Sequence, residues 1–172
     1  WYARAAEQGN DDAQASLGYA YAEGRGLKKD DRLAIEWTRK AAEEGNAVAQ
    51  HNLGQFYVEG RGVKKDMAEA AAWIRKAAEQ GYGEAQDTLG DLYENGTGVP
   101  RNAVEAARWY RKAAEQGNAN GQRHLATLYE KGVGVPRDPV LSMMWAILAA
   151  EQDDADAIAM RDRLAKLLGP AQ

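Results

Sequence analysis

Histidine is the residue type in this 172-residue chain best suited to metal binding or to proton transfer near neutral pH, and there are two, His51 and His124. A metal site needs several ligands that converge on one ion. The two histidines lie far apart in the sequence. Asp87 is the acid at the position that corresponds to His51 one repeat later, and no third ligand that would complete a metal site is evident. The sequence therefore predicts no metal site and no cofactor.

Acid–base and nucleophilic catalysis have no clear candidates either. The chain has 26 acidic residues, so carboxylates close together are expected by chance. It contains no G-x-S-x-G, Walker A or H-E-x-x-H pattern. A G-x-G element recurs, but neither a strand nor a further spaced glycine accompanies it, so it predicts a turn that ends a helix and no phosphate loop. We expect a protein that is not an enzyme.

Composition excludes further classes of function. A net charge of −4 and a pI near 5.3 argue against nucleic-acid binding, which normally needs a basic surface. No apolar run approaches the ~20 residues of a membrane span, so none is predicted. With no cysteine, the sequence gives no information on the redox compartment. Because the chain begins at Trp1 without an initiator Met, we expect a trimmed or processed piece.

A repeat of 36 residues organises the whole chain, and such a period is typical of solenoids. Tryptophan, glycine, leucine and tyrosine each recur at this spacing without slippage. The recurring residues are Trp1, Trp37, Trp73, Trp109 and Trp145; Gly9, Gly45, Gly81 and Gly117; Leu17, Leu53, Leu89 and Leu125; Tyr21, Tyr57, Tyr93 and Tyr129.

Each repeat is predicted to form two helices, A and B. In helix A of the second repeat, apolar residues recur at spacings of three and four, and Asn46 is placed to cap its first turn. Gly54, in the middle of this helix, indicates a close contact between helices. Gly60 and Gly62 end helix A, and Asp66 is placed to cap helix B. The predicted helices are 1–8, 11–23, 30–44, 47–59, 66–80, 83–95, 102–116, 119–131, 138–152 and 154–167.

No repeat could bury its apolar stripe alone, so the repeats must stack on one another. We predict one all-α domain over 1–172, a right-handed α-solenoid without an internal linker. The predicted sections are a partial helix B at 1–8, repeats at 9–44, 45–80, 81–116 and 117–152, and a C-terminal cap at 153–172.

The segment "AAAWIRKAAEQGYGEAQDTLGDLYENGTGV", residues 70–99, resembles the Sel1-like repeat, a relative of the tetratricopeptide repeat. The resemblance covers essentially residues 1–152; Tyr82 departs from it where Asn is usual. It implies a bacterial adaptor that binds another protein or a peptide, and it slightly favours a periplasmic or secreted location over the cytoplasm. Some relatives are rich in cysteine, and their properties do not carry over to a chain with none. We expect a monomer.

Helix A of related solenoids lines the concave surface, so the side chains there that vary between copies are candidates for partner binding. We call these the ladder residues. They are Asp12, Ser16, Tyr19 and Glu23; Val48, His51, Asn52, Gln55 and Glu59; Glu84, Asp87, Thr88, Asp91 and Asn95; Asn120, Arg123, His124, Thr127 and Lys131. The third group is acidic and the fourth is basic, which would fit a partner of complementary charge.

Three functions stay open at this point. The leading hypothesis is a non-catalytic scaffold that binds a protein or peptide through the concave surface of the helices A. One alternative is an architectural spacer inside a larger repeat protein. The other, by family analogy alone, is an envelope binding or immunity-type protein that neutralises a toxin.

Two features of the helices B also need an interpretation. Paired basic residues recur at Arg39-Lys40, Arg75-Lys76 and Arg111-Lys112, and each pair is followed by a glutamate at Glu43, Glu79 or Glu115. We interpret them as a solvated outer face. The helix at 138–152 lacks such a pair and carries Met143, Met144, Ile147 and Leu148 instead. We expect the following helix to cover this apolar face with Ile158, Met160, Leu164 and Leu167; the alternative is a groove for a partner.

Overall fold

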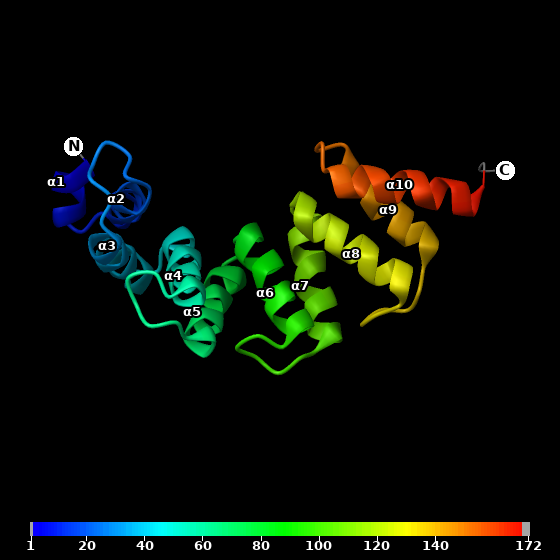
Figure 1. Ribbon diagram of the computed structural model, residues 1–172, viewed down its shortest axis with the longest axis horizontal. Helices are drawn as coiled ribbons and strands as arrows, with labels where there is room; N and C mark the ends of the chain where they lie inside the picture. Colours follow the sequence, from blue (N-terminus) through cyan, green and yellow to red (C-terminus); the bar gives the residue numbers. More distant parts are fainter. Residues whose placement is uncertain (1, 170–172) are drawn as a thin grey trace. The chain divides into compact units, whose positions relative to one another are not determined.

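The computed structural model describes residues 2–169, and it contains only α-helices in that range (Figure 1). The helices are α1 (Tyr2–Glu7), α2 (Asp11–Glu23), α3 (Asp31–Glu43), α4 (Ala47–Glu59), α5 (Met67–Glu79), α6 (Gly83–Asn95), α7 (Ala103–Glu115), α8 (Ala119–Lys131), α9 (Pro139–Ala150) and α10 (Ala155–Leu168). Each predicted helix is confirmed to within two residues at its ends, apart from Trp1, which lies outside the described residues. Helices α2, α4, α6 and α8 are the helices A.

Side-chain caps fix where the helices begin. Asn46 accepts a hydrogen bond from the backbone N–H of Ala49 at 2.9 Å, and Asp66 accepts bonds from two N–H groups of α5 at 3.0 Å. These bonds satisfy donors that the first turn of a helix leaves unpaired. The same arrangement occurs at Asn10, Asp30, Asn102, Asn118 and Asp138. The caps predicted from the repeat are confirmed.

Glycine is required in the loop that ends each helix A. Gly60 has φ of +70°, and its N–H donates to the carbonyl of Phe56 at 2.9 Å, which closes the helix. Gly62 also has φ of +70°, and a Cβ there would lie 2.6 Å from the backbone oxygen of Asp31. A side chain at Gly62 would therefore be strained and would also collide with the preceding helix B.

The glycine in the middle of α2, α4 and α6 marks a close approach of two helices, as predicted. A Cβ on Gly54 would lie 2.5 Å from Cγ1 of Ile74, and a Cβ on Gly90 would lie 2.5 Å from the ring of Tyr110. In the fourth repeat the corresponding pair is Ala126 and Ala146, both fully buried and in one cluster. The bulky partner therefore needs glycine opposite it, whereas alanine tolerates alanine.

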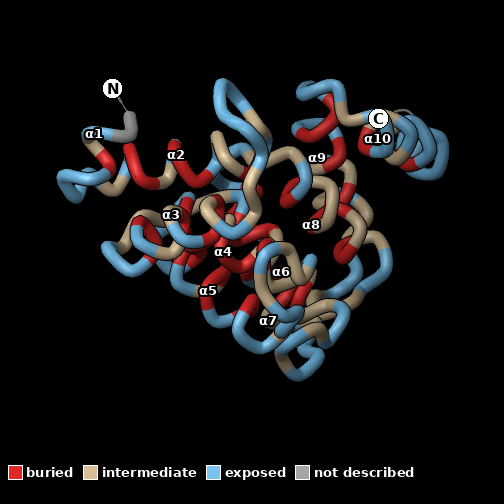
Figure 2. Tube along the Cα trace, turned by 60° about the vertical axis from the view of Figure 1, so that its left-hand side comes forward, coloured by how far each residue is buried: buried red, intermediate tan, exposed pale blue. Residues whose placement is uncertain are grey.

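Leucine and alanine side chains of neighbouring helices form a thin core, which is visible as the buried segments of α4 and α5 in Figure 2. Trp73 and Trp109 are also buried. The loop residue Val63 packs against the core. Its counterpart in the first repeat, Leu27, is 40% exposed.

The chain forms two compact units, and it passes from one to the other within α6. The first unit comprises residues 1–85 with 97–99, and the second comprises 86–96 with 100–172. In residues 2–169, no helix is both long and apolar enough to cross a membrane.

Buried glutamines link successive repeats in a way that the sequence did not suggest. Gln50 donates to the carbonyl of Ala42 at 3.1 Å, and its Oε1 accepts from Nε2 of Gln80 at 2.7 Å. Equivalent amide pairs join Gln116 to Gln86 at 2.6 Å and Gln152 to Gln122 at 3.0 Å. Each pair satisfies a buried amide and connects a helix A to the end of the next helix B.

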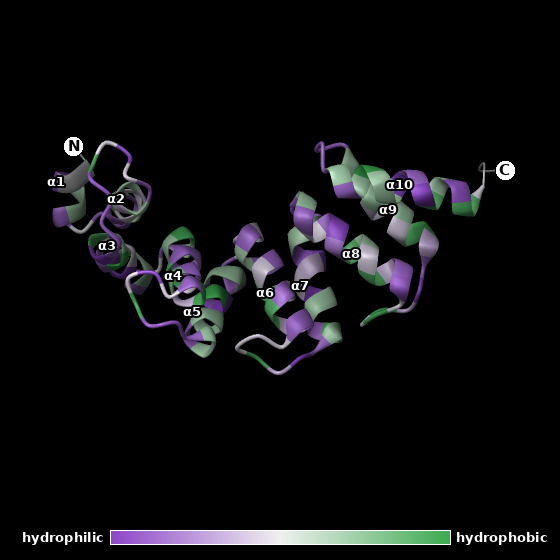
Figure 3. Cartoon of the chain, in the orientation of Figure 1, coloured by the Kyte–Doolittle hydropathy of each residue, from purple (hydrophilic) through white to green (hydrophobic). Residues whose placement is uncertain are grey.

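The last helix, α10, covers part of α9, a helix without charged residues (Figure 3). Leu164 is fully buried in a cluster with Met143 and Met160, and Ile158 packs beside the end of α9, so the predicted cap is confirmed for this part. Coverage is incomplete, because Met144, Ile147, Leu148 and Leu167 are exposed. Leu167 was therefore wrongly assigned to the cap: the buried face of α10 holds Ala157 and Leu164, and Leu167 lies off it.

Candidate partner-binding groove

The first unit has a groove formed by α2, α4 and the first turn of α6, which we call the α2–α4 groove. It is a hollow of about 530 Å³ with both polar and apolar walls. Its lining residues are Asp12, Ala15, Ser16, Tyr19, Asn46, Val48, Asn52, Tyr82 and Glu84. Six of these are ladder residues, so this part of the ladder lines a hollow in the surface.

A smaller hollow of about 130 Å³ adjoins it and shares Tyr19 and Asn52. Its lining residues are Tyr19, Ala22, Glu23, Thr38, Asn52, Gln55, Phe56, Glu59 and Arg61. Arg61 is fixed there by an ion pair with Asp31 at 2.7 Å and by a hydrogen bond to the carbonyl of Ala22. The two hollows together offer a continuous surface along one side of α2 and α4.

The α2–α4 groove combines exposed apolar side chains with carboxylates. Tyr19 and Val48 are 45% and 43% exposed, and Asp12 and Glu84 stand beside them. The hydroxyl of Tyr82 donates to Glu84 at 2.8 Å; partial burial, followed by this carboxylate, raises the pKa of Tyr82 to about 12. The phenol therefore stays neutral at physiological pH. An apolar surface bordered by negative charge suits a basic partner.

One ladder residue of the first unit, His51, lies outside both hollows because it is buried. Its Nε2 is 3.3 Å from Nε2 of Gln55, and its ring meets the edge of Tyr82 at 5.4 Å. Burial lowers the pKa of His51, with Glu84 opposing in part. Tyr82 was not predicted as a site residue, although its replacement of the usual Asn was a signal that could have found it.

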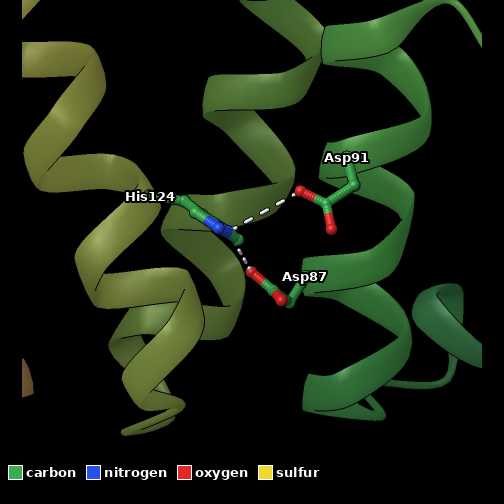
Figure 4. A group of neighbouring side chains, drawn as sticks. All are labelled: Asp87, Asp91 and His124. Carbon is green, nitrogen blue, oxygen red and sulfur yellow. Dashed lines mark hydrogen bonds and ion pairs between the residues drawn. The ribbon is translucent and has the colours of Figure 1, made fainter. Parts of the chain in front are cut away.

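In the second unit, the acidic and basic ladder residues contact each other (Figure 4). Nδ1 of His124 on α8 lies 2.9 Å from Oδ1 of Asp87 and 3.7 Å from Oδ1 of Asp91, both on α6. The expectation that no third ligand accompanies Asp87 and a histidine is therefore wrong, because Asp91 lies beside them. Asp87 and Asp91 are one helical turn apart, and the packing of α8 brings His124 opposite both.

Tyr110 of α7 contacts this cluster through both its hydroxyl and its ring. Its hydroxyl donates to Asp91 at 2.6 Å and is 2.7 Å from Glu94, and its ring centroid is 4.8 Å from that of His124. Burial, with these two carboxylates, raises the pKa of Tyr110 far above its usual value. Burial also raises the pKa of Asp91, against the opposing effect of the Tyr110 hydrogen bond. Tyr110 was not predicted as part of any site.

The other ladder residues of the second unit differ in exposure. Arg123 forms an ion pair with Asp154 at 3.2 Å, which ties α8 to α10, and the hydroxyl of Thr127 donates to the carbonyl of Arg123. Thr88 is half-buried, whereas Asn95, Asn120 and Lys131 are exposed. Part of the basic charge expected to face a partner is thus neutralised within the chain.

The paired basic residues on the helices B have structural contacts that the sequence did not reveal. Lys76 lies 3.7 Å from the ring centroid of Trp73, and Arg111 donates to the hydroxyl of Tyr129 at 2.6 Å. The equivalent contacts are made by Lys40, Lys112 and Arg39. In α9, Ile147 replaces the arginine, and Ala165 stands where its tyrosine partner would be. The ion pair of Lys40 is with Glu36 at 3.1 Å and not with Glu43.

Two-helix repeats, glycine turns and inter-repeat packing define this protein as an α-solenoid repeat protein. The Sel1 repeat model matches five segments, residues 1–10, 11–46, 47–82, 83–118 and 119–154. The chain therefore belongs to the Sel1 repeat family. Members of this family generally mediate protein–protein interaction as non-catalytic scaffolds.

Two solved structures, each with 41% sequence identity to this chain, share its fold. One is a protective antigen of uropathogenic Escherichia coli, with a TM-score of 0.88 over 91% of this chain and 33% of that one. The other is a Sel1 repeat protein of Oxalobacter formigenes, with a TM-score of 0.86 over 93% of this chain and 64% of that one. The chain thus spans about a third of the first relative and less than two thirds of the second.

A more distant structure is the cysteine-rich protein B of Helicobacter pylori. It has 26% identity and a TM-score of 0.62, over 80% of this chain and 98% of that one. Since the present chain has no cysteine, the likeness concerns the repeat fold. A comparison with curated proteins finds no similar sequence.

Proposed function

We propose that this protein is a binding scaffold that holds a segment of a partner protein in the α2–α4 groove. The observation that carries the proposal is the exposure of Tyr19 and Val48 side by side with the carboxylates of Asp12 and Glu84 in one concave surface. Exposed apolar side chains framed by polar residues are typical of interaction sites. A fitting segment carries an aromatic or aliphatic side chain between lysines or arginines.

The test begins with a display library of random peptides selected against the whole chain. We expect the enriched peptides to combine an apolar anchor with basic flanks. Tyr19→Ala should weaken their binding by tenfold or more, because an aromatic anchor in a groove commonly contributes about 2 kcal/mol. Affinity should also fall as salt is raised, since the carboxylates are at the surface.

A matched pair of variants separates groove binding from general surface adhesion. Val48→Ser changes an exposed valine inside the groove, and Val104→Ser changes an exposed valine at the start of α7. The proposal requires loss of binding with Val48→Ser and unchanged binding with Val104→Ser. If Tyr19→Ala and Val48→Ser both bind as tightly as the wild type, the proposal is contradicted. That result would favour the alternative of an architectural segment in a longer repeat protein.

A further inference from the structure

The geometry points to a divalent metal site in the second unit, formed by Asp87 and Asp91 of α6 and His124 of α8. One oxygen of each carboxylate and one ring nitrogen of the histidine lie within 4.8 Å of one another (Figure 4). No other group of three such residues is found among residues 2–169. The site is separate from the α2–α4 groove in both residues and chemistry.

The distances are close to those between ligands that share one ion. A transition metal lies about 2.0–2.2 Å from its carboxylate and imidazole ligands, which in tetrahedral geometry places neighbouring donor atoms about 3.3–3.6 Å apart. Nδ1 of His124 is 2.9 Å from Asp87 and 3.7 Å from Asp91. Small side-chain rotations, without movement of the helices, would complete the coordination.

A supporting shell holds the ligands in place. The buried hydroxyl of Tyr110 donates to the Asp91 carboxylate, as expected for a residue that orients a metal ligand. Its ring packs against that of His124 and fixes the direction of the imidazole. Gly90 leaves room for this ring, because a Cβ there would lie 2.5 Å from it. The arrangement is therefore built into the helix contact.

Charge and ligand type indicate which ion would bind. Asp87 and Asp91 both face the imidazole of His124, and Glu94 shares the Tyr110 hydroxyl with Asp91. A divalent cation would relieve the mutual repulsion of these carboxylates. One nitrogen and two oxygen ligands, without thiolate, suit a first-row ion such as Zn²⁺, Co²⁺ or Mn²⁺. Three protein ligands leave at least one position open to water or to a group of a partner.

The repeat provides an internal comparison. One repeat earlier, the positions of Asp87, Asp91 and His124 correspond to His51, Gln55 and Thr88, and one repeat later they correspond to Arg123, Thr127 and Met160. Neither alternative set has three groups that bind such an ion. Among these three sets of equivalent positions, only Asp87, Asp91 and His124 provide three metal-binding groups. The set is therefore not a consequence of the residues that recur for packing.

The experiment is a calorimetric titration of the chelator-treated whole chain with Zn²⁺. We expect one ion per chain in the wild type and a loss of affinity of at least tenfold in His124→Gln and in Asp91→Asn. His51→Gln removes the other histidine and should bind as the wild type does. Tyr110→Phe keeps the ring but loses the hydroxyl, and its affinity should fall by about tenfold.

Substitution with Co²⁺ gives a second readout that reports coordination directly. The wild type should show a visible absorption band that is absent in His124→Gln, whose folding is checked by circular dichroism. The proposal is overturned if the wild type does not bind Zn²⁺, if folded His124→Gln binds as tightly as the wild type, or if His51→Gln loses as much affinity. Asp91→Asn decides the matter if His124→Gln does not fold, since half of the Asp91 side chain faces solvent.

Discussion

Glu44 accepts a hydrogen bond from Nε2 of Gln14 at 3.3 Å, while Oε1 of the same Gln14 amide is buried without a partner. In the later repeats a glutamine takes the position of Glu44 and donates to the buried amide, as Gln80 does to Gln50. A carboxylate has no hydrogen to donate. The first repeat thus carries an unsatisfied acceptor that the other three avoid.

Glu44→Gln should therefore stabilise the protein. Its new amide would donate to Gln14, and a buried hydrogen bond contributes about 1 kcal/mol. We expect a rise in melting temperature of about 2–4 °C for a chain of this size. Glu43→Gln is the control, because it removes the same charge from the same end of α3 without reaching Gln14. A rise of equal size in both variants would assign the effect to helix electrostatics.

Ser142→Ala should also raise the melting temperature. The hydroxyl of Ser142 is fully buried and has no hydrogen-bond partner, and the equivalent residues in the other repeats are alanines, Ala34, Ala70 and Ala106. Removing it relieves about 1 kcal/mol of desolvation cost. Ser16→Ala, at an exposed position in α2, measures the gain from helix propensity alone, which is about 0.5 kcal/mol. The expectation fails if Ser142→Ala gains no more than Ser16→Ala.

The contact between Gly54 and Ile74 allows a double-mutant cycle. Gly54→Ala should destabilise by about 1–3 kcal/mol through overpacking, and Ile74→Ala should destabilise by about 2–5 kcal/mol through the loss of buried methyl groups. The double variant copies the Ala126–Ala146 pair of the fourth repeat. We expect its destabilisation, measured by urea unfolding, to be at least 1 kcal/mol less than the sum of the two. Simple additivity would show that the two positions are not in contact.

His51 should make the protein less stable in mild acid. Its pKa is lowered in the folded state below the ordinary 6.5, so the unfolded chain binds a proton more readily. Stability is therefore full at higher pH, and it decreases as the pH falls from about 7.5 through 6.5 and on towards the lowered pKa. His51→Gln should reduce this slope when unfolding free energy is measured from about pH 7.5 to 5.5. An unchanged slope would mean that His51 titrates normally in the folded protein.

The sequence predicted the helices, their caps and the glycine turns well, because these depend on residues a few positions apart. It also predicted Gly54 as a close contact, since only packing explains a recurrent glycine inside a helix. The ladder was partly informative. It located Tyr19 and Val48 in a groove but could not reveal that His51 is buried. Burial of a single polar side chain depends on residues that are distant in the sequence, here Tyr82 in the turn before α6.

The sequence by itself determined the fold class, because a 36-residue repeat allows each helix to bury its apolar stripe only against the next. Tertiary structure alone decided which polar groups meet. The approach of His124 to Asp87 and Asp91, the glutamine pairs and the position of Lys76 over Trp73 all depend on side-chain rotamers or on how one helix is turned against another. The spacing of residues along the chain constrains side-chain rotamers only weakly. It does not fix how one helix is turned against another.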